Sequence, residues 1–261
     1  MKRYRAVLTG ASGGLGRAIA AALAPHCDEL LLVGRDATRL AESAAAAGPV
    51  AKTLIADLAT AQGRAAVFLP GVNLLINNAG AGDFAWLAEQ NDAQLARIVE
   101  TNVTAPMQLT RRLLGELASQ PEAWIVNVGS IMGYLGYPGY AAYCASKFAL
   151  RGFSEALRRE LADGPVRVLH LAPRATRTAM NGARARALNA ELGVAMDEPA
   201  LVARELLELL RRPVRERLLG MPEALFARLN QLLPGVVDRA LRRQLPIIRR
   251  HAPASVEGNS Q

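Results

Sequence analysis

Tyr143 and Lys147 form the pair of residues in this chain whose types and spacing best suit proton transfer. They are four residues apart, so on a helix their side chains lie on the same face. A free tyrosine titrates at about pH 10, too high for a proton shuttle at neutrality, and a nearby ammonium group lowers that pKa. Such a tyrosine donates a proton to a ketone or accepts one from an alcohol. The alternative is a packed ring beside a solvated amine.

A second chemical feature is the glycine-rich segment Thr9–Gly16, which reads TGASGGLG. It follows an apolar stretch and opens an alanine-rich helical pattern. Glycines at such a place permit a tight turn and let backbone N–H groups at a helix start approach a pyrophosphate. A purely structural turn is the alternative, because a glycine-rich turn alone is a weak signal.

These residues need a scaffold, and the first 175 residues alternate short apolar runs with longer helical patterns. This alternation is typical of a parallel sheet with helices on both faces. The expected strands lie near Tyr4–Thr9, Glu29–Val33, Val50–Ala56, Val72–Asn77, Ala123–Val128 and Arg167–Leu171, with a short last strand at Arg217–Gly220. We therefore predict an α/β fold with a doubly wound parallel sheet of about seven strands.

Three helical or irregular segments bear on the site. Asp92–Ser119 has one apolar face, and Pro106 is expected to kink or interrupt it. Ala175–Asp197 has no strand signal and is expected to form a mobile lid. Asp197 is expected to cap a helix over Pro199–Arg211.

Composition indicates one globular domain with a large core, because 51% of the 261 residues are hydrophobic and 21% are charged. The two cysteines, Cys27 and Cys144, are too few for a disulfide framework and are expected to be unpaired thiols. No stretch resembles a secretion signal or approaches the roughly 20 apolar residues of a membrane-spanning helix. Three separated histidines indicate no metal cluster. We therefore expect a cytoplasmic protein without a metal.

The order of the motifs resembles the short-chain dehydrogenase/reductase family. The matching residues are the T-G-x-x-x-G-x-G segment Thr9–Gly16, then Asn77–Gly80, Asn102, Ser130, the Tyr143–Lys147 pair and Pro173–Thr178. The resemblance covers residues 1–220 and implies a Rossmann-like domain there. The chain beyond it exceeds the minimal fold of the family, and its composition predicts an Arg-rich amphipathic helical extension over 221–251 and a flexible tail over 252–261. It also implies an oxidoreductase that moves a hydride between a nicotinamide and a carbonyl or alcohol.

The family pattern implies catalytic roles for Asn102, Ser130, Tyr143 and Lys147. Tyr143 is the acid–base, and an oxidised nicotinamide adds to the effect of Lys147 in lowering its pKa. Ser130 hydrogen-bonds the substrate oxygen as charge develops on it, and Asn102 holds a water that links Lys147 to solvent. Taken singly, Ser130 is also compatible with a helix cap, and Asn102 with a hydrogen bond to backbone.

The resemblance further implies a set of cofactor-binding residues, to which the catalytic Tyr143 and Lys147 also belong. The others are Gly10, Ser12, Gly14, Leu15, Gly16, Arg35, Asp57, Leu58, Asn78, Ala79, Gly80, Pro173, Arg174, Thr176 and Thr178. Asp57 corresponds to the adenine-binding acid, with a helix cap as its alternative.

The end of the second expected strand favours NADP(H) over NAD(H). NAD enzymes of this type have an acid there for the ribose 2′-OH, whereas an Arg accommodates a 2′-phosphate. Gly34 occupies the acidic position, Arg35 follows it, and Arg39 lies one turn further on. NAD(H) is the alternative, because Asp36 is close in sequence and Ser12 is not the basic residue that many NADP-dependent members have in the glycine-rich turn.

Arg174 departs from the family pattern, which usually has glycine after this proline. Glycine permits backbone conformations that Arg adopts only at a cost. We expect Arg174 to reach the cofactor phosphates or the substrate. Thr178 still matches the residue expected near the nicotinamide and the pyrophosphate.

Apolar and aromatic residues around the expected site favour a lipophilic carbonyl substrate. They are Met132, Tyr134, Leu135 and Tyr137 after Ser130, and Met180, Leu188, Leu192 and Met196 in the lid segment. Such residues are also common in cores, so ordinary packing is the alternative.

Positive charge is concentrated near the C-terminus. The formal net charge is +8, and residues 211–261 contain ten Arg against four acidic residues. Two helices expected over Pro222–Leu233 and Gly235–Arg250 mix Leu and Arg at helical spacing. Such a piece is suited to an anionic membrane surface or an acidic carrier protein, and equally to packing on its own domain or a dimer partner. No nucleic-acid-binding signature accompanies the charge.

The residues together predict an NADPH-dependent carbonyl reductase, or the reverse alcohol dehydrogenase. The family commonly forms homodimers and homotetramers through the helices that bear Asn102 and Tyr143. Two other functions remain open: reduction of a carrier-bound 3-oxoacyl chain, and non-catalytic NADP(H) binding as a sensor or scaffold.

Overall fold

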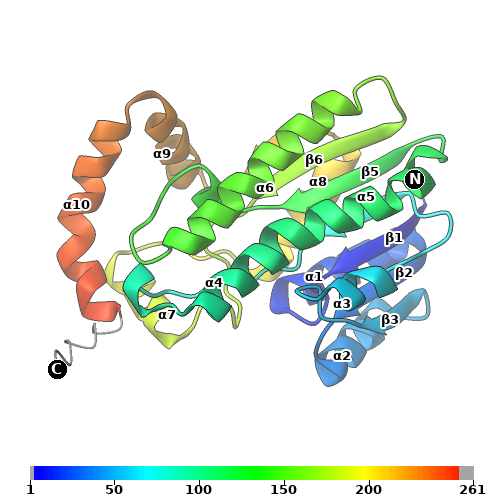
Figure 1. Ribbon diagram of the computed structural model, residues 1–261, viewed down its shortest axis with the longest axis horizontal. Coiled ribbons are helices and arrows are strands. Elements are labelled where there is room, and N and C mark those ends of the chain that lie inside the picture. Colours follow the sequence, from blue (N-terminus) through cyan, green and yellow to red (C-terminus); the bar gives the residue numbers. More distant parts are fainter. Residues whose placement is uncertain (1–2, 253–261) are drawn as a thin grey trace.

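A seven-stranded parallel sheet forms the centre of the protein (Figure 1). The computed structural model describes residues 3–252. The strand order is β3-β2-β1-β4-β5-β6-β7, and every pairing is parallel. The strands are β1 Tyr4–Thr9, β2 Cys27–Gly34, β3 Ala51–Ile55, β4 Leu74–Asn77, β5 Ala123–Val128, β6 Val166–Ala172 and β7 Glu216–Leu218. All seven expected strands are present, and their bounds differ from the prediction by no more than two residues.

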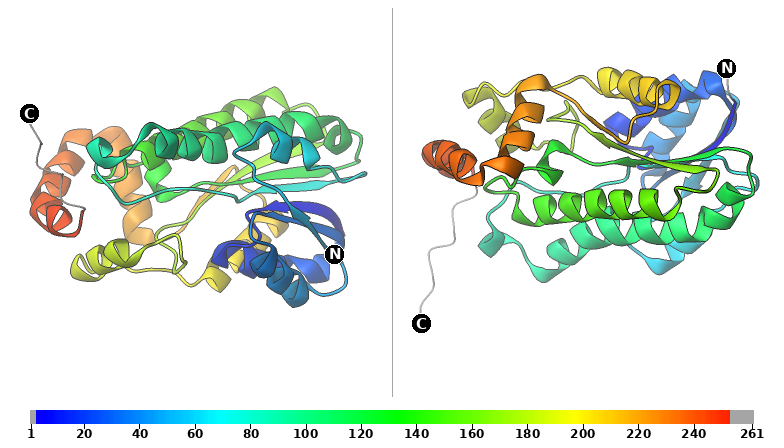
Figure 2. Two further views of the ribbon diagram at one scale, coloured as in Figure 1. Left: turned by 60° about the horizontal axis from the view of Figure 1, so that its bottom comes forward. Right: turned by 90° about the horizontal axis from the view of Figure 1, so that it is seen from above.

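Helices cover both faces of this sheet, as Figure 2 shows. They are α1 Gly14–Leu23, α2 Ala37–Ala47, α3 Ala61–Ala66, α4 Asp92–Val99, α5 Ala105–Ala118, α6 Ala141–Glu160, α7 Ala183–Glu191, α8 Pro199–Arg211, α9 Met221–Leu232 and α10 Pro234–His251. Helices α4, α5 and α6 lie on one face, and α1, α2 and α8 lie on the other (Figure 2). The Rossmann-like fold with C-terminal helices is therefore confirmed.

Alternation along each strand divides the core between the two faces. Leu8 in β1 packs in a cluster with Ile19 of α1 and Val202 of α8. Its neighbour Val7 packs in a second cluster with Leu109 of α5. Because successive side chains of a strand point to opposite faces, a strand covered on both faces is mostly apolar. This explains why the strands read as continuous apolar runs.

The long helix expected over Asp92–Ser119 is interrupted, as Pro106 predicts. Helix α4 leads into a π-helical turn, η3, over Glu100–Thr104, and α5 then begins at Ala105. Pro106 has no N–H to donate to the carbonyl four residues earlier, so the regular α-helical ladder is lost there. The interruption gives Asn102 a position between two helices rather than within one.

Asp197 does not cap α8, contrary to the prediction. The N-cap residue is Glu198, and its side chain makes no capping hydrogen bond. Asp197 instead pairs with Thr176 in an isolated parallel bridge and accepts hydrogen bonds from Arg174. Asp36, which was close enough in sequence to be a ribose acid, accepts a hydrogen bond from the N–H of Arg39 and caps α2.

The C-terminal helices α9 and α10 stand at one end of the molecule, beside α7 (Figures 1 and 2). Both agree with the expected helices to within one residue. Within residues 3–252, no helix has both the length and the apolar composition needed to cross a membrane. Cys27 and Cys144 are buried free thiols. The flexible tail predicted for 252–261 lies outside the described residues, apart from Ala252.

Candidate active site

The residues expected to act together lie at the carboxyl ends of β1, β4, β5 and β6. Strand β1 lies between β2 and β4, so the chain changes direction across the sheet at this point. Open α/β sheets bind ligands in the crevice outside the strand ends at such a switch point. The topology therefore brings the glycine-rich turn close to the residues that follow β4 and β5.

The glycine-rich turn is packed tightly against the loop after β4. Gly10 has a φ of +68°, and a Cβ on it would lie 2.7 Å from the Cα of Ala79. A Cβ on Gly16 would lie 2.2 Å from the carbonyl oxygen of Gly10. The Thr9 hydroxyl accepts hydrogen bonds from the N–H groups of Asn78 and Ala79. Gly10 and Gly16 are thus required by the fold itself, whatever the turn binds.

The start of α1 fits a pyrophosphate group. Its N-cap residue, Gly13, is extended and supplies no side-chain cap, and the first turn contains no acidic residue. Helix N-termini with free N–H groups attract anions. On the open side of Gly14, the nearest side chain is that of Thr178, 3.4 Å from the position of a Cβ. Gly14 and Thr178, both expected to bind the cofactor, therefore lie next to each other.

The end of β2 has a free cation and no free acid. A Cβ on Gly34 would lie 2.7 Å from the hydroxyl oxygen of Ser12, so a larger residue there would require the Ser12 side chain to move. Arg35 is exposed and has no ion pair or side-chain hydrogen bond with any residue in the described range 3–252. Arg39 lies near Asp36, with 3.6 Å between its Nε and the carboxylate. Arg35 is thus available to an anionic ligand.

Asp57 and Leu58 follow β3 at the same edge of the sheet. The Asp57 carboxylate accepts a hydrogen bond from the N–H of Ala59, while Thr60 caps α3. The helix-cap alternative for Asp57 is therefore wrong. Leu58 is buried, and its carbonyl oxygen accepts a hydrogen bond from Arg64.

Tyr143, Lys147 and Ser130 come together where β5 ends and α6 begins. Ser130 follows β5 and caps a short 3₁₀ turn, η4, over Ile131–Gly133, where its hydroxyl accepts from the N–H of Met132. The ammonium nitrogen of Lys147 lies 5.6 Å from the centroid of the Tyr143 ring and donates to the carbonyl oxygen of Val128. Lys147 is only 4% exposed. The shared helix face expected for Tyr143 and Lys147 is confirmed.

In the protein alone the pKa of Tyr143 is raised, whereas the predicted lowering combines Lys147 with an oxidised nicotinamide. Burial raises the pKa of Tyr143 to about 12, although a hydrogen bond with Ser130 acts to lower it. Burial also lowers the pKa of Lys147 to about 8. Loss of hydration disfavours any charged form, so burial raises the pKa of a phenol and lowers that of an ammonium group. In the protein alone, Tyr143 is therefore a neutral phenol able to donate a proton.

The Asn102 side chain is held by backbone and by α6, and its role in holding a water stays a prediction. Its amide oxygen accepts from the N–H of Ala81 at 2.7 Å. Its amide nitrogen donates to the carbonyl oxygen of Ala81 and to the Ser146 hydroxyl, at 2.8 and 2.9 Å. Ser146 in turn donates to the carbonyl oxygen of Tyr143. Asn102 thus links the loop that contains Gly80 to the helix that carries Tyr143 and Lys147.

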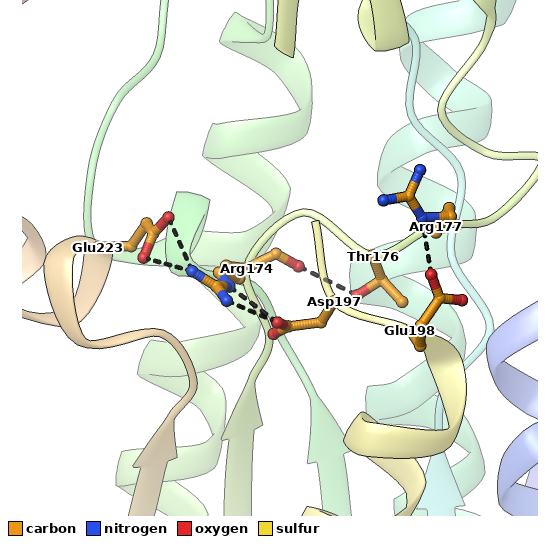
Figure 3. A network of polar contacts seen from close by, with 6 residues as sticks. All are labelled: Arg174, Thr176, Arg177, Asp197, Glu198 and Glu223. Carbon is orange, nitrogen blue, oxygen red and sulfur yellow. Dashed lines mark hydrogen bonds and ion pairs between the residues drawn. The ribbon is translucent and has the colours of Figure 1, made fainter. Parts of the chain in front are cut away.

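Arg174 points away from the glycine-rich turn and into a polar network (Figure 3). Two of its nitrogens donate to the Asp197 carboxylate at 2.8 and 3.0 Å, and a third contacts Glu223 of α9 at 3.3 Å. No residue other than glycine in the described range 3–252 has a positive φ, so Arg174 carries no left-handed strain. In this arrangement the guanidinium is engaged by two carboxylates rather than free for cofactor phosphates.

Its neighbours Pro173 and Thr176 belong to the same turn after β6. Pro173 accepts a backbone hydrogen bond from Ile131, and the Thr176 hydroxyl donates to the carbonyl oxygen of Arg174. The turn is thereby joined to the η4 segment on one side and to Asp197 on the other. Of the residues expected here, Thr178 lies nearest to Gly14.

The substrate side is lined by aromatic residues that sequence reasoning partly missed. The Tyr140 ring lies 6.2 Å from the Tyr143 ring, 5.2 Å from the Phe84 ring and 6.3 Å from the Tyr137 ring. Tyr137, Tyr140 and Tyr143 are each three residues apart, and this spacing could have been used to predict that their rings lie close together. A Cβ on Gly80 would lie 3.6 Å from the terminal methyl carbon of Met180, as the expected role of Met180 requires.

Tyr134 does not line this side, contrary to the prediction. It is buried beneath Arg151, whose guanidinium carbon lies 4.0 Å from the ring centroid, and it packs against Ala172 and Ala227. Leu188 of the lid is also buried. Both side chains serve packing, the alternative that the sequence left open.

A row of buried polar side chains runs beneath the site and was not expected. The Asn77 amide donates to the Asn127 amide oxygen, which belongs to the neighbouring strand, and Asn127 donates to the Ser154 hydroxyl. Ser154 lies 3.3 Å from Nδ1 of His170, and burial lowers the pKa of His170 to about 3. The row joins β4, β5, β6 and α6.

No group of three or more His, Cys, Asp or Glu side chains in residues 3–252 could hold a metal ion.

Comparison with known proteins agrees with this geometry. The sequence profile of the family described as short chain dehydrogenase matches residues 4–189. Nodulation protein G of Rhizobium sp. (strain N33) is 36% identical over 182 residues, which cover 67% of this chain and 74% of that protein. Dehydrogenase/reductase SDR family member 7B of Bos taurus is 30% identical over 258 residues, covering 90% of this chain and 79% of that protein.

Solved structures give the same result. A short-chain dehydrogenase from Sphingobium yanoikuyae in complex with NADPH is 28% identical with a TM-score of 0.75, and the match covers 98% of this chain and 99% of that one. A 3-ketoacyl-(acyl-carrier-protein) reductase from Brucella melitensis complexed with NADH is 26% identical with a TM-score of 0.72, covering 80% and 90%. The chain therefore belongs to the short-chain dehydrogenase/reductase family and is an oxidoreductase that acts on CH–OH or C=O groups.

Proposed function

We propose that the protein is an NADP(H)-dependent reductase of lipophilic ketones, able also to oxidise the corresponding alcohols, with Tyr143 as its acid–base. The observation that carries this proposal is the cluster of Ser130, Tyr143 and Lys147 beside the glycine-rich turn and the open start of α1. The three side chains lie at the strand ends, where this fold binds ligands.

In the reduction, the Tyr143 phenol donates its proton to the carbonyl oxygen of the substrate. A bound nicotinamide would supply the hydride that adds to the carbonyl carbon. Ser130 donates a hydrogen bond to the same oxygen as negative charge develops on it. Lys147, held by Val128 beside the ring, stabilises the tyrosinate that remains. The pKa of about 12 for Tyr143 supports the proton-donor role, because the phenol is neutral at physiological pH.

The residues at the end of β2 support NADP(H) over NAD(H). Arg35 is an exposed cation with no partner within residues 3–252, which suits a 2′-phosphate. Gly34 supplies no ribose-binding carboxylate, and Asp36 is used as the cap of α2. A structural relative is described in complex with NADPH and another with NADH, so the fold itself accommodates either nucleotide.

The side chains near Tyr143 support a lipophilic substrate. Phe84, Tyr137, Tyr140 and Met180 border the space next to its ring and to Gly80. Sites that bind apolar molecules are lined mainly by such groups, with a few polar groups to orient the reacting atom. Here Ser130 and Tyr143 are those polar groups.

A second candidate is reduction of a 3-oxoacyl chain carried by an acidic protein. The excess of Arg in α9 and α10 favours it, as does the likeness to a reductase described as acting on 3-ketoacyl carrier protein. Non-catalytic NADP(H) binding is the remaining alternative. A homodimer or homotetramer stays a prediction, and the exposed Met107 of α5 and Phe148 of α6 support contacts through these helices.

The proposal is tested by NADPH oxidation with a panel of aliphatic, aromatic and steroid ketones and acyl thioesters. We expect turnover in the wild type, faster with NADPH than with NADH, and a loss of at least about 100-fold in kcat for Tyr143→Phe. Tyr4→Phe, at the opposite end of β1, is the matched control and should retain activity. Tight NADPH binding without turnover of any ketone or alcohol would favour the sensor function.

A further inference from the structure

The turn between α9 and α10 exposes large apolar side chains. We call Leu232, Leu233 and Val236 the apolar apex; their side chains are 79%, 55% and 52% exposed. Pro234 and Gly235 complete the turn between them. Burying an isolated Leu or Val side chain is worth about 1.5–3 kcal/mol, so three exposed together at a convex turn are a costly arrangement in water.

Arginines surround the apolar apex about one helical turn back from it. Arg228 precedes Leu232 by four residues and Arg239 follows Val236 by three, which places them about 4.5–6 Å behind the apex along each helix axis. Arg242 and Arg243 lie one turn further along α10. All four are exposed, and none has an ion pair with any residue from 3 to 252. Asp238 is the one acidic residue between Arg228 and Arg250.

The opposite side of the helix pair is fixed to the active-site face. Ala227, Val237 and Ile248 are buried. Asn230 donates to the carbonyl oxygen of Tyr134, and the Tyr137 hydroxyl bonds to Gln244. The apolar apex is therefore the outward face of a docked helical hairpin rather than a displaced part of the core. The hairpin contacts the loop that follows Ser130, on the substrate side of the site.

We propose that the apolar apex inserts into the surface of an anionic lipid bilayer, with Arg228, Arg239, Arg242 and Arg243 at the depth of the headgroups. Interfacial binding of this kind needs only a few apolar side chains buried to about 5–10 Å and cations that reach anionic headgroups. The calculated offset of the arginines matches that depth. A stable protein partner needs roughly 1,200 Å² or more of contact, which a narrow convex turn offers poorly.

Docking in this way brings the loop after Ser130 next to the membrane. Tyr137, which borders the substrate side, donates a hydrogen bond to Gln244 of α10, so the hairpin is in direct contact with this side of the site. A lipophilic substrate dissolved in the bilayer would then lie close to Tyr143. This consequence depends on the proposed function, but the membrane contact itself does not.

The test uses the full chain and sedimentation with vesicles of phosphatidylcholine, alone or with 30% phosphatidylserine. Leu232→Ser/Leu233→Ser/Val236→Ser removes the apex, and Phe68→Ser/Val214→Ser removes exposed apolar residues elsewhere as a matched control. Arg228→Gln/Arg239→Gln is compared with Arg111→Gln/Arg167→Gln, two exposed arginines outside the hairpin. Thermal melting establishes that each variant is folded.

We expect partitioning onto anionic vesicles that falls at least tenfold in the apex variant and about 25-fold in the Arg228→Gln/Arg239→Gln variant, with both controls unchanged. Leu232→Trp should add a blue-shifted emission, quenched by brominated lipid, when anionic vesicles are present. Absence of partitioning, or equal partitioning of the apex variant and wild type, would overturn the proposal. Two results would instead identify the apex as a protein interface. One is a wild-type dimer that the apex variant does not form, and the other is binding of an acidic carrier protein that the apex variant has lost. None of these readouts requires enzymatic activity.

Discussion

The ammonium nitrogen of Lys147 lies 5.6 Å from the centroid of the Tyr143 ring, while its hydrogen bond goes to the main-chain oxygen of Val128. The lysine is thus fixed by the end of β5 and supplies charge beside the phenol without bonding it. Burial lowers the pKa of Lys147 to about 8, against an ordinary value of 10.5. Because this pKa differs between the folded and unfolded protein, the free energy of unfolding depends on pH in the alkaline range.

We predict that the wild type gains stability relative to Lys147→Met as the pH rises from 7 to 9.5. Between pH 8 and 10.5 the unfolded chain retains the Lys147 proton while the folded protein has released it, so raising the pH favours the folded state. The contribution is about 2 kcal/mol over this range. Urea denaturation at several pH values measures it. Lys147→Met, which has no titrating group, should lack the gain, and an identical pH dependence in both proteins would contradict the prediction.

Arg35 provides a prediction about cofactor preference. Arg35→Gln is expected to raise the KM for NADPH by at least about tenfold and to leave that for NADH unchanged, because a charge-assisted hydrogen bond to the 2′-phosphate is lost. Steady-state kinetics with both nucleotides measures the two values. Arg111→Gln, on α5, is the control for loss of one positive charge. An equal change in KM for NADPH and NADH would mean that Arg35 does not bind the 2′-phosphate.

Gly82 allows the position of the Tyr143 ring to be tested without changing a reacting group. A Cβ on Gly82 would lie 2.4 Å from the Cδ2 atom of Tyr143, so Gly82→Ala must displace the ring or the loop. We expect kcat to fall by at least about tenfold, because proton transfer depends closely on the distance between donor and acceptor. Gly136→Ala, with nothing within 4 Å of the new Cβ, should retain wild-type kcat. Unchanged kcat in Gly82→Ala would show that the ring position is not critical.

Arg174 and Asp197 allow a prediction about stability. Asp197 is buried, and two Arg174 nitrogens donate to it, so Arg174→Gln leaves a carboxylate in the interior without its cation. We expect a loss of about 2 kcal/mol in the free energy of unfolding. Denaturation of Arg174→Gln, Asp197→Asn and the double variant should give a coupling energy of at least about 1 kcal/mol. Strictly additive effects would mean that the pair contributes nothing beyond its separate residues.

The sequence alone was sufficient to predict the strands and helices. It was also sufficient to predict that Tyr143 and Lys147 lie on the same face of a helix. Strands covered on both faces are mostly apolar, which made β1, β4 and β5 recognisable. Tyr143 and Lys147 are four residues apart, so their side chains lie on the same face only if the segment is a helix. Pro106 identified the interruption before α5, because an imino acid cannot complete the helical ladder. These are local effects, and each depends on residues close together in the chain.

Only the tertiary structure determined which charged groups from distant segments lie together, and in which direction burial shifts a pKa. Arg174 was expected at the cofactor, but the fold places Asp197 and Glu223 against it, from segments 23 and 49 residues away. Enclosure by the folded chain raises the pKa of Tyr143, an effect that the spacing to Lys147 did not reveal. Burial and the approach of side chains from other elements depend on packing across the whole sheet, and no local pattern in the sequence records them.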